Sequence, residues 1–441
     1  MMNVHLEKEN LNFSSFVFVV TGMSYIIDSS GTSKVVKAHE KVFVDAGIGY
    51  VVIFPISRSR GEGASWHVKT TGCYALIING KLIDIVTSNE VLNYLVELTN
   101  TGKKCIGILV HHLIRNNIEE IQRILSTIID VPVVFYLHDF YSCCINPAMM
   151  RNDEESCLSG YHSCEGCVFE NKRTRHIEVI KRFFSAFAKR LSFVAPSDYV
   201  KQKWVTYYPE YVERVRVISH QKAIGSYEQN KAQIGEDEHI KIAYVGTQTR
   251  LKGWEVFKNV VTSVKERSCN YKFYYCGNGN DTIPNVESIP VEIAKMGNDA
   301  MIRALRENGI SVVLLLSLCS ETYSYTMYEA HAANSFIIAL RESGNLDYMV
   351  ANQNWGIVCD RESDLISLLL HETTFRKQLN DWRSNCQAGA EKYVDNDAIL
   401  ELFPTSNSGT VVWQRKSVSM TQGLKRRIVG WLFLKSRMKG K

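Results

Sequence analysis

One stretch of the sequence, residues 312–340 (VVLLLSLCSETYSYTMYEAHAANSFIIAL), constrains the fold more than any other. Its apolar runs at 312–316 and 336–340 are short and continuous, which is typical of buried strands. Between them, a polar turn at 317–324 leads into a predicted helix over 325–333. Strand, helix and strand in this order predict a parallel sheet covered by helices, and therefore an α/β fold.

Two carboxylates lie on this stretch, Glu321 on the turn and Glu329 on the helix. At about 1.5 Å per residue, the helical span between them is roughly 12 Å, close to the length of a nucleotide sugar from hexose to ribose. A carboxylate accepts two hydrogen bonds from a vicinal diol, and a helix N-terminus favours a diphosphate. The spacing fits a nucleotide-diphosphate sugar. The alternative is two glutamates near a helix, one capping it and the other solvated.

Length and composition indicate a globular protein of two or three domains, since the chain has 441 residues, 45% of them hydrophobic and 22% charged. The net charge of +5 is too weak to indicate nucleic-acid binding, and we expect none. The N-terminus is polar, and the apolar run at 16–20 is too short for a signal peptide or a membrane span. Twelve cysteines without such a signal favour a reducing compartment, so we expect a cytoplasmic location.

Both halves of the chain repeat the pattern of strand and helix, which predicts two Rossmann-like, doubly wound parallel-sheet domains. We predict an N-terminal domain over 1–221 with a cysteine-rich insertion at 141–170, a polar linker over 222–239, and a second domain over 240–385. A helix over 386–404 is expected to cross back to the first domain, followed by a basic amphipathic tail over 405–441.

In the first half, polar residues follow two predicted strands. His111 and His112 end the strand at 105–110, and His138 and Asp139 end the strand at 131–137. Ligands of open α/β sheets bind at the carboxyl ends of strands, so we expect a sugar or acceptor site there. The alternative is histidines on ordinary helix-start turns. Gly31, in a loop that lacks G-x-G-x-x-G, either lets a ligand approach the backbone or is a simple turn glycine.

In the second half, the loop at 246–253 (GTQTRLKG) follows the strand at 241–245. Arg250 and Lys252 in this loop could neutralise a diphosphate, Arg250 by bidentate contact and Lys252 as a point charge. The alternative is two surface charges on a polar loop.

Four cysteines, Cys144, Cys157, Cys164 and Cys167, have the spacing C-x12-C-x6-C-x2-C. Four thiolates with one tight pair are typical of a structural zinc site, with His162 as a competing ligand. Such a metal would fasten the insertion and take no part in chemistry. The alternative is a loop with reduced thiols.

The tail from residue 410 carries many cations and no acid between apolar residues. Its cations are Arg415, Lys416, Lys425, Arg426, Arg427, Lys435, Arg437, Lys439 and Lys441. This composition favours an anionic membrane surface, so we expect peripheral association with the inner face of the membrane. A disordered tail or a nucleic-acid patch are the alternatives.

Together these residues resemble the retaining glycosyltransferases of family 4, which have the GT-B fold. The similar segments are YVGTQTRLKGW (244–254), FYYCGNG (273–279) and SETYSYTMYEAHAANSFIIAL (320–340), with weaker similarity at VVFYLHDF (133–140), VAPSDYV (194–200) and VISH (217–220). The resemblance covers most of residues 15–400.

The resemblance implies roles for individual residues. Glu321 would contact the donor sugar and Glu329 the ribose, while Arg250 and Lys252 would hold the diphosphate with Gly246 and Ser324. His138 would lie near the transferred sugar, and Gly31, His111 and Asp139 on the acceptor side. Two departures affect the phosphate loop. The family usually has Arg after the loop glycine, where this chain has Thr247, and Phe-Gly where it has Tyr323-Ser324.

The implied function is transfer of a sugar from a UDP- or GDP-sugar to a saccharide or polyprenol-linked acceptor in polysaccharide biosynthesis. We expect retention of anomeric configuration and no metal ion in catalysis, with donor and acceptor in a cleft between the domains. Two alternatives remain, a nucleotide-sugar epimerase of the same fold and a non-catalytic nucleotide-sugar-binding scaffold.

Overall fold

The computed structural model describes residues 12–27, 30–57, 70–152, 154–157, 164–227, 232–265, 270–385, 391–414, 416–417, 422–423, 425–430 and 433. These residues divide into two compact units. Unit 1 comprises Met1–Pro147, Phe169–His220 and Asp395–Lys441, and unit 2 comprises Ala148–Val168 and Gln221–Val394.

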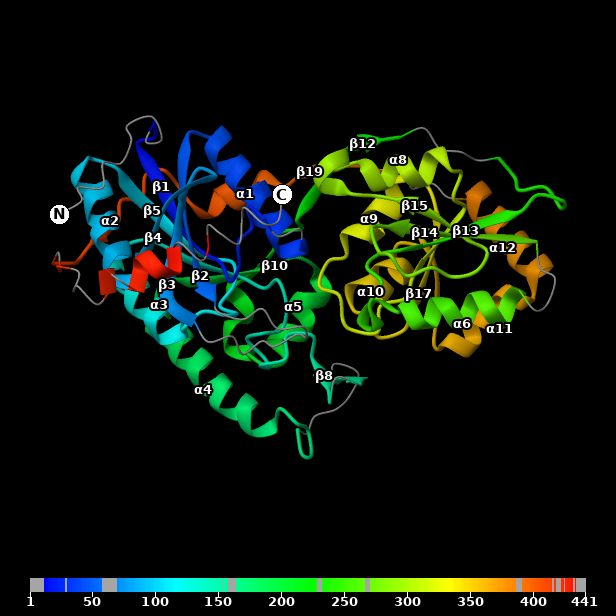
Figure 1. The fold of residues 1–441 in the computed structure, drawn as a ribbon, viewed down its shortest axis with the longest axis horizontal. Coiled ribbons are helices and arrows are strands. Elements are labelled where there is room, and N and C mark those ends of the chain that lie inside the picture. The colour runs from blue at the N-terminus through cyan, green and yellow to red at the C-terminus, as the bar shows by residue number, and fades with distance from the viewer. Residues whose placement is uncertain are drawn as a thin grey trace. The chain divides into compact units, whose positions relative to one another are not determined.

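Unit 1 contains an eight-stranded sheet in the order β11-β10-β7-β5-β1-β2-β3-β4. Figure 1 labels β1, β2, β3, β4, β5 and β10 of this sheet. The run from β11 to β2 is parallel, and the hairpin β3–β4 adds two antiparallel strands at one edge. The sheet strands are β1 (Ser15–Val20), β2 (Ile48–Ser57), β3 (Thr70–Ile78), β4 (Lys81–Thr87), β5 (Lys104–Val110), β7 (Val133–Tyr136), β10 (Leu191–Ala195) and β11 (Val215–Val217). The predicted parallel sheet of the first half is confirmed.

The helices of unit 1 are α1 (Gly31–Asp45), α2 (Ser88–Asn100), α3 (Ile118–Leu125), α4 (Glu170–Ala186) and α5 (Asp198–Val205). Short polar side chains begin several of them, as expected for N-caps. Ser30 accepts from Ser33 N at the start of α1, and Thr87 forms a capping box with Glu90 at the start of α2. Short elements complete the unit: β6 (Ile128–Ile129), η3 (Pro209–Arg214), η5 (Asp397–Leu402) and β20 (Thr410–Val411), which pairs with β6.

The described part of the C-terminal tail packs against unit 1. Val429 is buried in the same core cluster as Ile85 and Phe54, and the ring of Phe433 lies 6.3 Å from that of Phe54. Arg426 donates to Glu90 Oε1 over 2.6 Å. Lys425, Arg427 and Ile428 are exposed on the same helical segment. One apolar side of the segment is therefore directed at the protein, while Lys435, Arg437, Lys439 and Lys441 lie outside the described residues.

Unit 2 contains a six-stranded, all-parallel sheet in the order β15-β14-β13-β16-β17-β18. Its strands are β13 (Ile240–Val245), β14 (Tyr271–Gly277), β15 (Val286–Pro290), β16 (Val312–Leu315), β17 (Phe336–Leu340) and β18 (Gly356–Cys359). Its helices are α6 (Trp254–Lys265), α7 (Ile293–Met296), α8 (Ala300–Glu307), α9 (Tyr325–Ala332), α10 (Asn345–Asn352), α11 (Glu362–Leu370) and α12 (Glu372–Asn385). The smaller elements are η4 (Arg250–Lys252), the pair β8 (Met150–Arg151) and β9 (Glu155–Ser156), and the pair β12 (Gln221–Ser226) and β19 (Glu391–Asp395).

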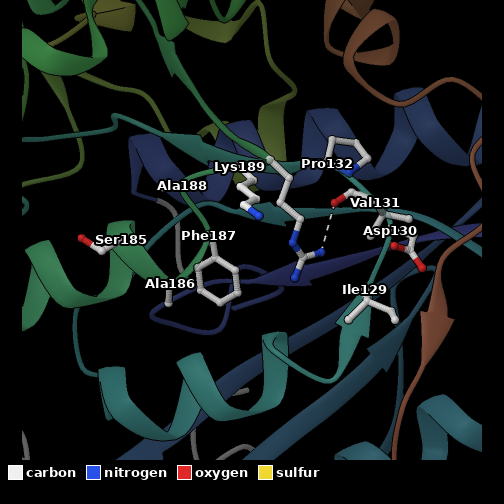
Figure 2. Close-up of a pocket in the computed structure, with 10 residues that line it drawn as sticks. Ile129, Asp130, Val131, Pro132, Ser185, Ala186, Phe187, Ala188 and Lys189 are labelled. Carbon is white, nitrogen blue, oxygen red and sulfur yellow. Dashed lines mark hydrogen bonds between the residues drawn. The ribbon is translucent and has the colours of Figure 1, made fainter.

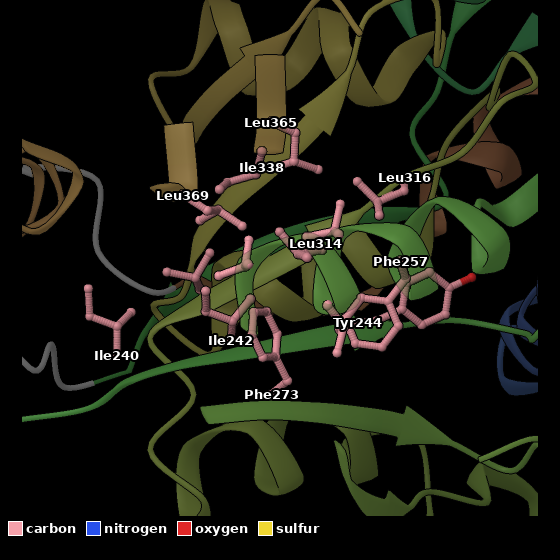
Figure 3. Packing of buried hydrophobic residues seen from close by; sticks show 14 of the residues in the cluster. Ile240, Ile242, Tyr244, Phe257, Phe273, Leu314, Leu316, Ile338, Leu365 and Leu369 are labelled. Carbon is pink, nitrogen blue, oxygen red and sulfur yellow. The ribbon is translucent and has the colours of Figure 1, made fainter. Parts of the chain in front are cut away.

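Side chains alternate between the two faces of this sheet and form a separate core on each. On one face, Ile242 and Leu314 pack with Leu365 of α11 (Figure 3). On the other face, Val313 and Ile337 pack with residues of α8, α9 and α10. Burial on both faces explains why the central strands β16 and β17 are continuous apolar runs in the sequence.

Two predicted segments differ from the structure. The helix expected over 386–404 is wrong in its described part, where β19 is followed by the short 3₁₀ helix η5. β-branched and aromatic residues such as Val394 favour a strand, and the Asn396 side chain then caps η5 by accepting from Ala398 N over 3.1 Å. The polar segment expected as a linker over 222–239 likewise begins within a strand, β12.

None of the helices within the described residues is long and apolar enough to span a membrane.

Candidate nucleotide-sugar and acceptor sites

In unit 2, the predicted donor residues follow two adjacent strands, β13 and β16, at the carboxyl edge of the sheet. Gly246 follows β13 with a φ of 143°, and η4 carries Arg250 and Lys252. The turn after β16 carries Glu321. The carboxyl ends of adjacent parallel strands are where ligands of such sheets bind, so the topology brings both loops to one place.

Gly253 explains how closely these loops meet. Its φ is 80°, and a Cβ at this position would lie 2.0 Å from the carbonyl oxygen of Leu316. Leu318 N donates to Leu251 O over 2.8 Å and fastens the same two segments. Only glycine fits here, because a side chain would push the loop away from the turn.

The close approach places Lys252 against Glu321, and the two form an ion pair. Ser317 Oγ lies 2.8 Å from the same oxygen, Glu321 Oε1. Burial alone would lower the pKa of Lys252, but the neighbouring Glu321 carboxylate raises it above its ordinary value. Lys252 therefore keeps its positive charge, and its side chain is still 41% exposed.

The backbone of Glu321 is fixed by the segment that leads into α10. Glu321 N donates to Ser343 O over 2.9 Å, and Asn345 N donates to Glu321 O over 2.7 Å. Gly344, with a φ of 85°, permits this, since a Cβ there would lie 2.6 Å from Glu321 O. The carboxylate is thus held on a rigid turn.

The turn ends at Ser324, which precedes α9 and has a φ of 67°. This left-handed conformation is the one that glycine adopts without strain. The first turn of α9 follows Ser324 directly, and Met327 N in that turn donates to Ser324 O over 3.1 Å.

The other two predicted donor residues occupy different surroundings. Glu329 lies on α9 and is 5% exposed, whereas Arg250 is exposed on η4. Lys252 and Glu321 are in direct contact. Arg250 lies on η4 beside Lys252, and Glu329 lies on α9, the helix that follows the turn of Glu321.

In unit 1, the two histidine pairs predicted at strand ends come together. His111 Nδ1 lies 2.8 Å from His138 Nε2, and His112 Nε2 lies 2.6 Å from Asp139 Oδ2. Since β5 and β7 are adjacent parallel strands, their carboxyl ends meet at one edge. The sequence thus located this cluster, and the structure adds the contacts.

His111 and His138 are buried and held neutral. Burial lowers the pKa of His111 and His138 well below the usual value, and the other histidines nearby lower it further. Burial also lowers the pKa of His39, on α1, to about 3. His39 and His220 lie against the cluster, with ring centroids 5.1 Å from His111 and 5.6 Å from His138 respectively.

Gly31 and His111, both predicted on the acceptor side, take part in the protein's own structure. Gly31 is the first residue of α1, directly after the N-cap Ser30. His111 is 1% exposed, and its second ring nitrogen lies 3.0 Å from the hydroxyl of Tyr50. Both ring nitrogens of His111 are therefore engaged within the protein, which makes it a supporting residue of His138.

Sequence reasoning missed Ser317, Tyr50 and the role of Gly253. Ser317 is the second residue after β16, a position that points to the site, but a lone serine there carries no specific signal. Tyr50 lies within β2, and only the strand order shows that its side chain reaches His111.

The predicted zinc ligands belong to different units. Cys144 is in unit 1, and Cys157, Cys164 and Cys167 are in unit 2. Cys167 N donates to Cys164 O over 3.0 Å, so this pair lies on one tight turn. The described residues contain no group of three or more His, Cys, Asp and Glu side chains arranged to hold a metal, and His162 lies outside them. The zinc site stays a prediction.

The sequence has one D-x-D triplet, Asp395-Asn396-Asp397, a spacing often associated with metal-bound diphosphates. It lies at the junction of β19 and η5, where Asn396 caps η5. Burial raises the pKa of Asp395, and Lys34 and Lys41 oppose this. Asp395, Asn396 and Asp397 begin the last segment of unit 1, whereas the Lys252–Glu321 pair belongs to unit 2.

Unit 1 also has a pocket of about 810 Å³, lined by residues 129–132 and 185–190 (Figure 2). These segments precede β7 and β10, so the pocket lies at the amino edge of the sheet, opposite His111 and His138. Arg190 donates to Val131 O over 3.0 Å and lies over the ring of Phe187. None of the predicted site residues lines this pocket.

No protein-family profile matches the chain. No curated protein matches it either. Among solved structures, HepE from Anabaena, determined in complex with UDP-glucose, matches with a TM-score of 0.50 and 11% identity over 85% of this chain and 94% of HepE.

Two further solved structures have slightly lower scores. Sucrose-phosphate synthase from Thermosynechococcus elongatus has a TM-score of 0.49 and 10% identity over 85% of this chain and 95% of its own. WaaG, a glycosyltransferase involved in lipopolysaccharide biosynthesis, has a TM-score of 0.48 and 11% identity over 83% of this chain and 94% of its own. At such identities the likeness to HepE is one of fold, the α/β fold with two Rossmann-like units known as GT-B.

Proposed function

We propose that the protein is a retaining glycosyltransferase whose unit 2 binds a nucleotide-diphosphate sugar and whose unit 1 binds the acceptor. The observation that carries this proposal is the Lys252–Glu321 ion pair at the carboxyl edge of the unit 2 sheet, directly before the N-terminus of α9. A fixed carboxylate for sugar hydroxyls, a cation and a helix N-terminus in one place match the three parts of such a donor.

Each donor residue would have one task. Glu321, held by Ser317 and by the backbone before α10, would accept hydrogen bonds from the sugar hydroxyls. Lys252 and Arg250 would stabilise the charge that develops on the leaving diphosphate. Glu329, on α9, would hold the ribose.

No carboxylate in this arrangement is needed as a nucleophile. The acceptor oxygen would attack from the face that the diphosphate leaves, and the departing phosphate would take the acceptor's proton, which gives retention. The cations of η4 and the first turn of α9 would replace a metal ion on the diphosphate. Preorganised donors of this kind are each worth roughly 3 kcal/mol.

We further propose that the acceptor is a saccharide or polyprenol-linked saccharide at the inner face of the membrane. The support is the outward side of the tail helix, where Lys425, Arg427 and Ile428 are exposed while Val429 is buried. Replacing Lys425 and Arg427 by glutamate should abolish binding to vesicles with anionic lipid and leave the fold intact. Unchanged binding would show that this side of the tail helix is not the membrane-binding surface.

Turnover tests the reaction. The full chain is incubated with UDP- or GDP-sugars and a membrane saccharide extract, and proton NMR follows nucleoside diphosphate release and the anomeric configuration of the product. Wild type should release the diphosphate and retain the configuration, and Glu321→Gln should lose at least a hundredfold in kcat. Conversion of the donor alone into another nucleotide sugar would identify an epimerase, and binding without any turnover would identify a scaffold.

A further inference from the structure

One residue of unit 2, Asp281, contacts both ends of the segment that carries Arg250 and Lys252. This segment, residues 249–253, belongs to the loop after β13 and contains η4. Asp281 belongs to the loop after β14, the strand that pairs with β13 in the sheet. Both loops therefore leave the carboxyl edge of the sheet side by side, and the contacts between them lie within one unit.

The first of these contacts is with Gln248, directly before the segment. Gln248 Nε2 donates to Asp281 O over 2.6 Å, and Asp281 N donates to Gln248 Oε1 over 2.8 Å. An amide that donates to a residue and accepts from the same residue is fixed in both position and orientation. Gly279 leaves room for this amide, because a Cβ at residue 279 would lie 2.1 Å from Gln248 Oε1.

The second contact is with Trp254, which directly follows the segment and begins α6. Trp254 Nε1 donates to Asp281 Oδ2 over 2.7 Å, and Lys258 Nζ lies 2.7 Å from the same oxygen. Hydrogen bonds from Lys258 and Trp254 lower the pKa of Asp281, so its carboxylate stays ionised. The Trp254 side chain is buried, and its ring centroid lies 5.2 Å from those of Tyr244 and Tyr275. The indole is therefore held in place by the core of unit 2.

Between Gln248 and Trp254, the backbone of the segment forms one tight turn. Lys252 N and Trp254 N both donate to Thr249 O, over 3.1 and 3.2 Å respectively. The hydroxyl of Tyr244 donates to Lys252 O over 2.9 Å. Because the turn is so short, movement at either end would also move Lys252, whose side chain forms the ion pair with Glu321.

We propose that Asp281 is a positioning residue, which holds Lys252 at the donor diphosphate through its contacts with Gln248 and Trp254. This inference rests on the proposed function, since the diphosphate is the ligand proposed for Lys252. Asp281 acts through the loop after β13 and makes no contact with the donor itself. Its backbone fixes the start of the segment, and its carboxylate fixes the end.

A double-mutant cycle on the full chain tests whether Asp281 acts through Lys252. Isothermal titration calorimetry measures the binding of UDP and GDP to wild type, Asp281→Ala, Lys252→Ala and the double variant. For the nucleotide that wild type binds more tightly, Asp281→Ala should weaken binding about fivefold, but less than about twofold when Lys252 is already alanine. Equal losses in the two backgrounds would show that Asp281 does not act through Lys252.

Three further variants separate the positioning role from a general loss of stability. Gln248→Met removes both hydrogen bonds at the start of the segment and should weaken binding as much as Asp281→Ala. Asp281→Asn keeps an oxygen for the indole of Trp254 and should restore binding. Glu255→Ala is the matched control, because Glu255 also contacts Lys258, over 3.1 Å, and its loss leaves Gln248 and Trp254 in place. A loss in this control as large as in Asp281→Ala would contradict the proposal.

The amine of Lys252 provides a test that needs no nucleotide. Burial lowers its pKa, but the Glu321 carboxylate raises it above the ordinary value. NMR of the full chain with ¹³C-labelled lysine measures this pKa, and Lys252→Arg assigns the signal. Gln248→Met changes no charge, yet the pKa should fall towards that of an exposed lysine, as in Asp281→Ala.

The outcomes separate this inference from the function on which it rests. An unchanged pKa of Lys252 in both Gln248→Met and Asp281→Ala would overturn the positioning role. If the pKa falls in both variants while wild type binds neither UDP nor GDP, the positioning of Lys252 is confirmed and its assignment to a donor diphosphate is wrong.

Discussion

Ser324 adopts a backbone conformation that an L-residue occupies at a cost. Its φ is 67° at the N-cap of α9, and its hydroxyl lies 3.2 Å from Thr326 Oγ1. A non-glycine residue in this region costs about 1–2 kcal/mol. The chain thus tolerates local strain directly before the helix N-terminus proposed to hold the diphosphate.

Ser324→Gly should therefore raise the free energy of unfolding by about 1 kcal/mol, since it removes the strain and loses only one partly buried hydroxyl contact. Ser324→Ala is the control, because it loses the hydroxyl but keeps the strain, and it should not be stabilised. Urea unfolding of both variants measures this. A destabilised glycine variant would show that the hydroxyl contributes more than the strain costs.

Four buried histidines, His39, His111, His138 and His220, make the stability of unit 1 depend on pH. Burial lowers each pKa below the ordinary value of 6.5. Below pH 6.5 the unfolded chain then binds more protons than the folded one, so stability is complete above this pH and falls as the pH falls. Each such group contributes up to about 1.4 kcal/mol per pH unit.

His39→Phe should reduce this pH dependence by about that amount between pH 6 and 4.5, because phenylalanine keeps the ring contacts without a titrating group. His371→Gln, on the exposed end of α11, should leave the dependence unchanged. Unfolding free energies at a series of pH values provide the test. Identical slopes in wild type and His39→Phe would contradict the burial of a neutral His39.

At the scale of elements, Gly253 brings η4 against the turn after β16. Gly102 has a similar φ, 83° against 80°, but a Cβ at Gly102 would meet nothing within 4 Å. Substitutions at the two glycines can therefore separate two costs, that of the left-handed backbone conformation and that of a Cβ clashing with Leu316.

Gly102→Ala should lower the free energy of unfolding by about 1–2 kcal/mol, the cost of the left-handed conformation alone. Gly253→Ala should cost clearly more and should also weaken nucleotide binding, because Lys252 would move away from Glu321. Denaturation and nucleotide titration of both variants test this. Equal costs and unchanged binding would show that the contact with Leu316 does not position η4.

The elements that the sequence predicted well are those with a strong periodic signal. The continuous apolar runs of β16 and β17 predicted buried strands of a parallel sheet, and the structure confirms them. The segment over 386–404 was mistaken for a helix, because its strand β19 forms only by pairing with β12, which is distant in sequence. Strand pairing between distant segments leaves no local pattern of residues in the sequence from which it could be predicted.

Within the candidate sites, the sequence located the residues but not their contacts. His111 and His138 were predicted together because strand ends of a parallel sheet share one edge. The Lys252–Glu321 pair and the Tyr50–His111 contact depend on Gly253 and on strand order, respectively, which one sequence does not reveal.

At the scale of the whole molecule, the C-terminal tail would contribute both to the stability of unit 1 and to binding of the protein at the membrane surface. Val429 is buried in the core of unit 1, whereas its neighbour Ile428 is 52% exposed. The segment is thus part of the fold on one side and available to a surface on the other.

Val429→Ser should lower the free energy of unfolding by about 2 kcal/mol, the value of burying one such side chain. Ile428→Ser should change it by less than about 0.5 kcal/mol and should weaken binding to anionic vesicles. Thermal unfolding and vesicle sedimentation measure the two effects. Equal destabilisation by both substitutions would contradict the observed orientation of the tail.

The central claim, that the carboxyl edge of unit 2 binds a nucleotide-diphosphate sugar, is tested most directly by thermal shift with UDP, GDP, ADP and CMP. At a hundred times its dissociation constant, the correct nucleotide should add about 2.7 kcal/mol to the stability of the wild type. Lys252→Ala should lose most of this gain, and Lys377→Ala, an exposed lysine on α12, should keep it. No shift with any nucleotide, or equal shifts in both variants, would contradict the account.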